Sequence, residues 1–144
     1  MSGPVVIAPC EDEPELRDPL VAGAFAKEMA SIGSQLHLVP WCGYFGRREG
    51  VPVGFGGFTS APDQDGHVEI GYLTFPAHAG TGVATEITAA LVAIARSNGL
   101  RAVIANTLAE PNGSTRVLEK NGFIRDGTSV DPDEGEVWRW KLEL

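Results

Sequence analysis

Residues 67–99 read HVEIGYLTFPAHAGTGVATEITAALVAIARSNG, and this stretch decides the fold. Its beginning alternates apolar and polar side chains up to Pro76, as expected for a strand that ends where the backbone loses a hydrogen-bond donor. Apolar residues then recur at helical spacing over residues 83–94, and the Asn-Gly pair at 98–99 supplies a C-terminal stop. The stretch therefore predicts a strand, a glycine-containing loop and a helix.

Gly80 and Gly82 lie just before the predicted helix. Such a loop directs unpaired backbone N–H groups and the positive end of a helix dipole at one small volume, which favours a phosphate or another anion. Two glycines before a helix also occur in plain turns, so both interpretations stay open. The loop does not match a P-loop, because Val83 and Ala84 replace Lys and Ser or Thr. It does not match a dinucleotide fingerprint either, since Thr85 replaces the third glycine or alanine.

Three segments resemble the GNAT superfamily of acetyl-CoA-dependent N-acetyltransferases, in the order expected for that family. They are EIGYLTFPAHAGTGVATE at 69–86, EPNGSTRVLEKNGF at 110–123 and DPDEGEVWRWKL at 131–142. The chain is most similar to the branch that includes the ribosomal-protein alanine N-acetyltransferases, and the match covers roughly the last 80 residues. Before Val51 the resemblance is only architectural.

The resemblance implies an α/β fold in a single domain, with a central, largely antiparallel sheet of about seven strands and helices on both faces. The remaining patterns agree with this expectation. They predict strands at 5–8, 41–47, 51–58, 100–107, 123–130 and 136–144, and helices at 20–32 and 114–121. Asn112 and Ser114 are both suitable N-caps for the last helix.

Length and composition limit the class of protein. The 144 residues suit one domain, and no repeat or linker divides residues 1–144. A net charge of −8 argues against nucleic acid as a ligand. The acidity would suit a cationic partner, or would simply keep the protein in solution. No apolar run is long enough to span a membrane, and the N-terminus does not resemble a secretory signal.

Cysteine and histidine usage predicts no metal site and a cytoplasmic location. Cys10 and Cys42 match no metal-ligand spacing and are too few for a disulfide framework. The three histidines are scattered along the chain. The aromatic residues Trp41, Tyr44 and Phe58 could line an acceptor pocket, although aromatic residues in strands usually belong to the core.

The resemblance also assigns cofactor-binding residues. Backbone amides of the glycine loop would bind the pyrophosphate of acetyl-CoA, at Ala79, Gly80, Thr81, Gly82, Val83, Ala84 and Thr85. The pantetheine arm and the acetyl group would lie beside Leu73, Thr74 and Phe75, where a backbone N–H would face the thioester oxygen, and near Asn112 and Ser114. Ala79 stands where the family carries Gln or Arg, so the loop lacks its usual polar or cationic side chain.

Glu69 is the candidate general base, because an amine must lose a proton to attack a thioester. On the alternating strand it lies opposite Ile70 and Tyr72, on the face directed towards the acetyl group. A purely structural, hydrogen-bonded carboxylate remains the alternative. Many relatives use a tyrosine to protonate the leaving thiolate, and Leu118 occupies that position here. Ser114 would then assist, or the thiolate would leave without an acid.

These features predict an enzyme that transfers an acetyl group from acetyl-CoA to a primary amine by direct attack. The acceptor would be a protein N-terminus or a small cationic amine. The alternative is an acetyl-CoA-binding module or sensor that has lost turnover, because Ala79 and Leu118 depart from the family pattern. A homodimer is also possible.

Overall fold

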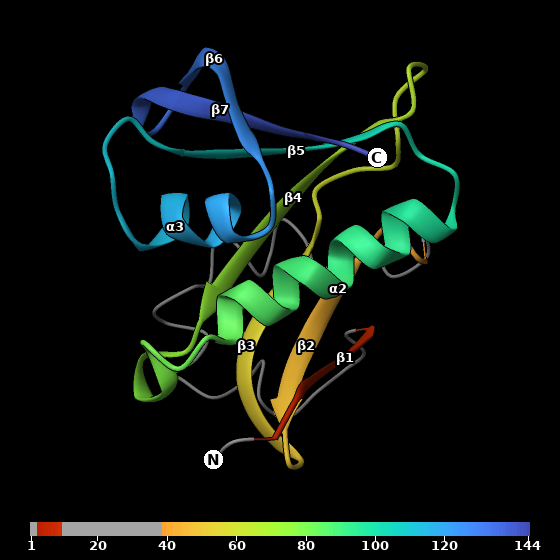
Figure 1. Ribbon diagram of the computed structural model, residues 1–144, viewed down its shortest axis with the longest axis vertical. Coiled ribbons are helices and arrows are strands. Elements are labelled where there is room, and N and C mark those ends of the chain that lie inside the picture. The colour runs from red at the N-terminus through yellow and green to blue at the C-terminus, as the bar shows by residue number, and fades with distance from the viewer. Residues whose placement is uncertain (1–2, 10–38) are drawn as a thin grey trace.

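The computed structural model describes residues 3–9 and 39–144, and within them seven strands form one sheet in the order β1-β2-β3-β4-β5-β7-β6 (Figure 1). The strands are β1 (Val5–Pro9), β2 (Gly43–Arg48), β3 (Val51–Phe58), β4 (His67–Thr74), β5 (Ala102–Leu108), β6 (Ile124–Asp131) and β7 (Gly135–Glu143). The helices are η3 (Pro76–His78), α2 (Val83–Ser97) and α3 (Gly113–Lys120). The predicted α/β order is confirmed, and the helix predicted at 20–32 lies outside the described residues.

The sheet is antiparallel except where β4 pairs with β5. This parallel pairing is short. It runs only from the pair His67 and Ala102 to the pair Glu69 and Ile104, and beyond it the two strands separate (Figure 1). The prediction of a largely antiparallel sheet is therefore confirmed, and the second half of β4 lies beside an opening on its β5 side.

Helix α2 packs unusually close to the sheet because glycines form the surface beneath it. Ile87 is fully buried and lies over Gly46, Gly54 and Gly56 of β2 and β3. A Cβ atom on Gly56 would lie 2.6 Å from the Ile87 side chain, and one on Gly54 would lie 2.7 Å from the carbonyl oxygen of Leu73. The helix therefore reaches the sheet at a distance that a larger residue would not allow.

The apolar stripe predicted on α2 is buried against the sheet. Of the predicted members, Val83, Ile87 and Leu91 are buried together with the adjacent Ala95, whereas Ile94 is half-buried against the core. Helix α3 adds the fully buried Leu118 on the same face of the sheet, so both helices lie on the near side in Figure 1. Phe58 and Tyr44 are buried with edge-to-face ring contacts, which confirms the core interpretation of these aromatic residues.

The segment after β4 differs from the predicted loop. Residues Pro76–His78 form a short 3-10 helix, because Pro76 is already restricted to helical φ and needs no N–H donor in the first turn. Strand β4 accordingly ends at Thr74. The turn between β2 and β3 is formed by Glu49 and Gly50, which both adopt positive φ, at 53° and 80°. This geometry matches the twist of a tight hairpin.

The glycine surface under α2 generates a stability prediction. Gly54→Ala should lower the free energy of unfolding by about 1–3 kcal/mol, because the added methyl group meets the backbone oxygen of Leu73 and the side chain of Ile87. Urea unfolding followed by circular dichroism would measure the loss. Gly113→Ala is the matched control, since a Cβ there meets no atom within 4 Å. Equal stability of the two variants would contradict the close-packing account.

Candidate active site

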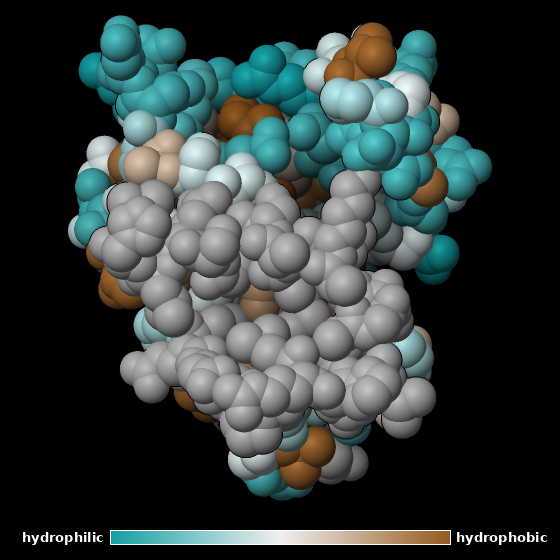
Figure 2. All heavy atoms as spheres, turned by 180° about the vertical axis from the view of Figure 1, so that it is seen from behind, coloured by the Kyte–Doolittle hydropathy of each residue, from teal (hydrophilic) through white to brown (hydrophobic). Residues whose placement is uncertain are grey.

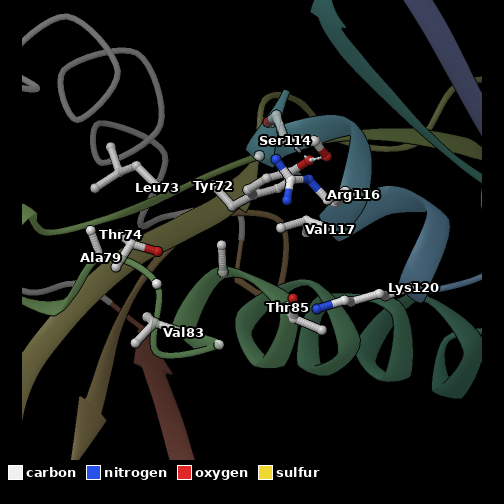
Figure 3. Close-up of a pocket in the computed structure, with 14 residues that line it drawn as sticks. Tyr72, Leu73, Thr74, Ala79, Val83, Thr85, Ser114, Arg116, Val117 and Lys120 are labelled. Carbon is white, nitrogen blue, oxygen red and sulfur yellow. Dashed lines mark hydrogen bonds between the residues drawn. The ribbon is translucent and has the colours of Figure 1, made fainter. Parts of the chain in front are cut away.

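A cavity of about 540 Å³ lies where β4 separates from β5, between β4, the glycine loop, α2 and α3 (Figure 3). Nine of the residues predicted to bind the cofactor line it: Leu73, Thr74, Ala79, Gly80, Gly82, Val83, Ala84, Thr85 and Ser114. The structure thus brings together residues from β4, the loop and both helices. Arg116, Val117 and Lys120 of α3, together with Gly113 and Tyr72, complete the described lining.

The glycine loop presents open backbone groups to this cavity. Gly80 and Gly82 have φ values of 76° and 81°, a left-handed conformation that favours glycine. A Cβ atom on either would meet nothing within 4 Å. Gly82 is the N-cap of α2 and makes no side-chain capping hydrogen bond. The first-turn N–H groups of α2 therefore remain available to an anionic ligand.

A buried arginine fixes the loop from behind. Arg48, only 4% exposed, donates from Nη2 to Glu86 Oε2 at 2.7 Å and to the carbonyl oxygen of Thr81 at 3.2 Å. Its Nε donates to the carbonyl oxygen of Gly3 at 2.8 Å, while Glu86 Oε1 accepts from the backbone N–H of Val5 at 3.0 Å. The start of β1, the end of β2 and the first turn of α2 are thus joined at the loop.

Arg116 and Lys120 are cationic residues that the sequence analysis did not assign to the site. Both are exposed, and in Figure 3 they extend from α3 into the cavity. They are four residues apart, so they lie on one side of the helix. The sequence shows this spacing of two cations, but the spacing indicates a binding site only once α3 is known to lie opposite α2 across the cavity. They supply positive charge that the loop itself lacks at Ala79.

Three predicted cofactor residues do not line this cavity in the described part of the chain. Phe75 is buried in the core, with its ring centroid 6.2 Å from that of Phe45. Thr81 donates to the carbonyl oxygen of His78 at 2.6 Å. Asn112 caps α3, since its side chain accepts from the backbone N–H of Thr115. Of the two predicted caps, Asn112 is therefore the one used.

Tyr72 and Ser114 bring hydroxyl groups from β4 and α3 together at the cavity wall. Tyr72 Oη donates to the carbonyl oxygen of Ser114 at 3.1 Å, and Ser114 Oγ donates to Tyr72 Oη at 3.3 Å. Burial raises the pKa of Tyr72 to about 12, against the opposing effect of the Ser114 hydrogen bond. The phenol therefore stays protonated at neutral pH, and its hydrogen is the one donated to the Ser114 carbonyl oxygen.

A smaller cavity of about 140 Å³ lies at the strand separation, next to the larger cavity. It shares Tyr72, Leu73 and Ser114 with the larger cavity, and Phe55, Ile70, Gly71 and Asn106 complete its described lining. Asn106 also lines a third cavity, of about 300 Å³, on the opposite face. Each cavity thus shares at least one lining residue with the next, so the three are neighbours from one face of the sheet to the other.

Glu69 lines the third cavity, on the face opposite to Ile70 and Tyr72, as the alternation along β4 predicts. Its Oε1 accepts from Asn106 Nδ2 at 3.1 Å, and its Oε2 accepts from Thr59 Oγ1 at 3.2 Å. Val68 and Ile70, its neighbours in β4, are buried on the face that α2 covers. The half-buried carboxylate is therefore oriented by two neutral donors, an arrangement that leaves it without a countercharge at hydrogen-bond distance among the described residues.

Residues 3–9 and 39–144 contain no group of three or more His, Cys, Asp and Glu side chains that could hold a metal ion. None of the helices in these ranges is both long and apolar enough to span a bilayer.

Comparisons with known proteins agree with this architecture. A profile of the acetyltransferase (GNAT) domain matches residues 14–124. No curated protein matches the chain by sequence. The solved structure of the yncA protein of Salmonella typhimurium with acetyl-CoA is similar to this chain, with a TM-score of 0.73 and 19% identity, covering 97% of this chain and 94% of that one.

Two further structures with coenzyme A share the fold. A ribosomal L7/L12 α-N-protein acetyltransferase has a TM-score of 0.68 and 18% identity, covering 77% of this chain and 67% of that one. An aminoglycoside acetyltransferase has a TM-score of 0.64 and 20% identity, and the match covers 89% of this chain and 74% of that one. The ribosomal-protein branch is thus one of several types of structure that this chain resembles.

The buried arginine generates a second stability prediction. Arg48→Met should lower the free energy of unfolding by about 1–3 kcal/mol, because it removes the cation from a partly buried ion pair and leaves the Thr81 carbonyl unpaired. Urea unfolding would measure this loss. Arg96→Gln, an exposed change in the last turn of α2, should cost less than about 1 kcal/mol. A similar loss in both variants would mean that the contacts of Arg48 do not stabilise the protein.

Proposed function

Because the chain belongs to the GNAT acetyltransferase family, we propose that it transfers the acetyl group of acetyl-CoA to a primary amine. The observation that carries this proposal is the set of three neighbouring cavities, which lie between the glycine loop on one face of the sheet and Glu69 on the other. The proteins with a similar fold that were solved with acetyl-CoA or coenzyme A support the choice of co-substrate.

The larger cavity would hold the co-substrate. Its pyrophosphate would accept hydrogen bonds from backbone N–H groups of residues 80–85, at the positive end of the α2 dipole. Arg116 and Lys120 would neutralise phosphate charge from the facing helix. The missing cation at Ala79 therefore does not rule out binding. The apolar Leu73 and Val117 suit the pantetheine arm.

Strand β4 would position the thioester with its backbone. The N–H of Phe75 donates to β3, and the carbonyl oxygen of Glu69 accepts from Thr59. The backbone N–H and C=O groups of the odd-numbered residues of β4 are therefore directed towards β3. The N–H groups of Tyr72 and Thr74 are then directed towards β5, where pairing has ended. A donor there would stabilise the negative charge that develops on the thioester oxygen.

Glu69 would take the proton that the amine loses, directly or through one water. The amine nitrogen forms a bond to the acetyl carbon, the carbon–sulfur bond breaks, and the electron pair of that bond leaves with sulfur. The products are the N-acetylated amine and the thiol of CoA, with one proton going to sulfur. The Tyr72 hydroxyl lies at the cavity wall and donates its one hydrogen to the Ser114 carbonyl oxygen in the structure; to stabilise the departing thiolate it would turn from that carbonyl and donate to sulfur instead. This would replace the tyrosine whose position Leu118 occupies.

Two acceptor classes follow from the sequence analysis, a protein N-terminus and a small cationic amine. The compared proteins include a protein α-N-acetyltransferase and an aminoglycoside acetyltransferase, so the fold accommodates both. The alternative function is a binding module for acetyl-CoA without turnover. It is favoured by the buried, nonpolar Leu118 at the position of the usual acid.

The test of the proposed function is release of CoA thiol from acetyl-CoA with a panel of primary amines. Glu69→Gln should lower kcat by about 100-fold at neutral pH, because the variant lacks a base for the amine proton. The affinity for CoA, measured by calorimetry, should not change, since Glu69 lies outside the larger cavity. Glu119→Gln on the exposed side of α3 is the matched control. CoA binding without thiol release by any variant would favour the binding module.

The cations of α3 provide a separate test of co-substrate binding. The double variant Arg116→Gln with Lys120→Gln should weaken CoA binding by at least about tenfold, because two charge-assisted contacts to phosphate are lost. The double variant Arg96→Gln with Arg101→Gln removes the same charge from exposed positions outside the cavity. If both double variants bind CoA with equal affinity, Arg116 and Lys120 contribute to binding only through the long-range attraction of net charge.

A further inference from the structure

The third cavity contains charges of both signs. Its described lining is Ser60, Ala61, Asp63, His67, Val68, Glu69, Ile104, Asn106, Ser129 and Arg139. It lies on the face of the sheet that is turned away from α2 and α3. The upper end of this face, over β5, β6 and β7, is mostly hydrophilic (Figure 2). A cavity intended only for a cationic amine would not need an arginine, because the guanidinium repels that amine.

Strand register places Arg139 on the same face as Glu69. Arg139 of β7 pairs with Asn106 of β5, and Asn106 donates to Glu69 of β4. Paired residues on adjacent strands point to the same side of a sheet. The neighbours of Arg139 in β7, Trp138 and Trp140, belong to the core on the α3 side. Glu69 itself pairs with Ile104, two residues before Asn106, so Glu69 and Arg139 are two strand spacings apart and offset by two residues, about 12 Å between backbones, with Asn106 between them.

Arg139 has unused hydrogen-bonding capacity. It is half-buried, and among the described residues it makes no hydrogen bond or ion pair. Asp63 interacts with it only electrostatically. The Asp63 Oδ1 atom is already bonded to the backbone N–H groups of Asp65 and His67, and the His67 contact is the main reason that the pKa of Asp63 is lowered. The guanidinium therefore keeps its fork of donors for another carboxylate.

Resting on the function proposed above, we propose that the acceptor is a small amino acid: a primary amine that also bears a carboxylate. Arg139 binds the carboxylate, and Glu69 receives the amine at the end of the cavity nearest the thioester. Asn106 holds the Glu69 carboxylate in place between the two ends. The volume of about 300 Å³ is at the lower limit for ligand pockets, which suits an amino acid better than a large aminoglycoside.

The experiment compares matched pairs of acceptors that differ only in the carboxylate. Amino acids with α-, β- and γ-amino groups are assayed beside their carboxamides, with thiol release from acetyl-CoA as the readout. The wild-type protein should prefer at least one acid over its amide by at least about tenfold in kcat/KM, mainly through a lower KM. Arg139→Gln should reduce this preference to about one, and Arg139→Lys should restore part of it.

Arg125→Gln is the matched control, since Arg125 lies on the neighbouring strand with its guanidinium 4.1 Å from the centroid of the Trp138 ring on the opposite face. It should keep the wild-type preference. Equal use of acids and amides by the wild-type protein, or an unchanged preference in Arg139→Gln, would overturn the proposal of an amino acid acceptor. The proposed acetyltransferase activity would not be affected, and Arg139 would then only balance the charge of Asp63. Absence of thiol release with every amine would instead contradict the acetyltransferase itself.

Discussion

The contact between Arg48 and Glu86 is the interaction on which the candidate site depends. Glu86 lies in the first turn of α2, where its charge suits the helix dipole but would repel a bound diphosphate. Arg48 neutralises that charge at 2.7 Å and holds the Thr81 carbonyl as well. The carboxylate also accepts from β1. One buried guanidinium thus keeps the loop in place while the N–H groups of the helix stay available.

The second constraint is the short pairing between β4 and β5. Because the strands pair only up to Glu69 and Ile104, the second half of β4 has backbone groups directed into an opening instead of a neighbouring strand. An opening inside a sheet would normally cost stability through unpaired polar groups. Here the opening holds a small cavity that shares lining residues with both the cavity beside α3 and the polar cavity around Glu69. Under the proposed function, groups on opposite faces of the sheet would then act on one bond.

Much of the local architecture could be predicted from the sequence, and so could part of the site. The loop glycines, the helix stripe and the face of Glu69 depend on neighbours along the chain, and the structure places them as expected. The strands predicted at 41–47 and 51–58 leave Arg48 between them without a role, because nothing local relates it to Thr81, 33 residues later. Arg116 and Lys120 were missed for the same reason. The three predicted residues outside the larger cavity have local structural roles.

The sequence by itself determined the order of strands and helices, the left-handed loop before α2 and the alternation that separates Glu69 from the core. These properties arise from backbone preferences and side-chain periodicity within a few residues. Only the tertiary structure decided that three glycines would support Ile87, and that Glu69, Asn106 and Arg139 would share one face. Those arrangements depend on the register between strands distant in the chain, because a shift by one residue would turn each side chain to the other face.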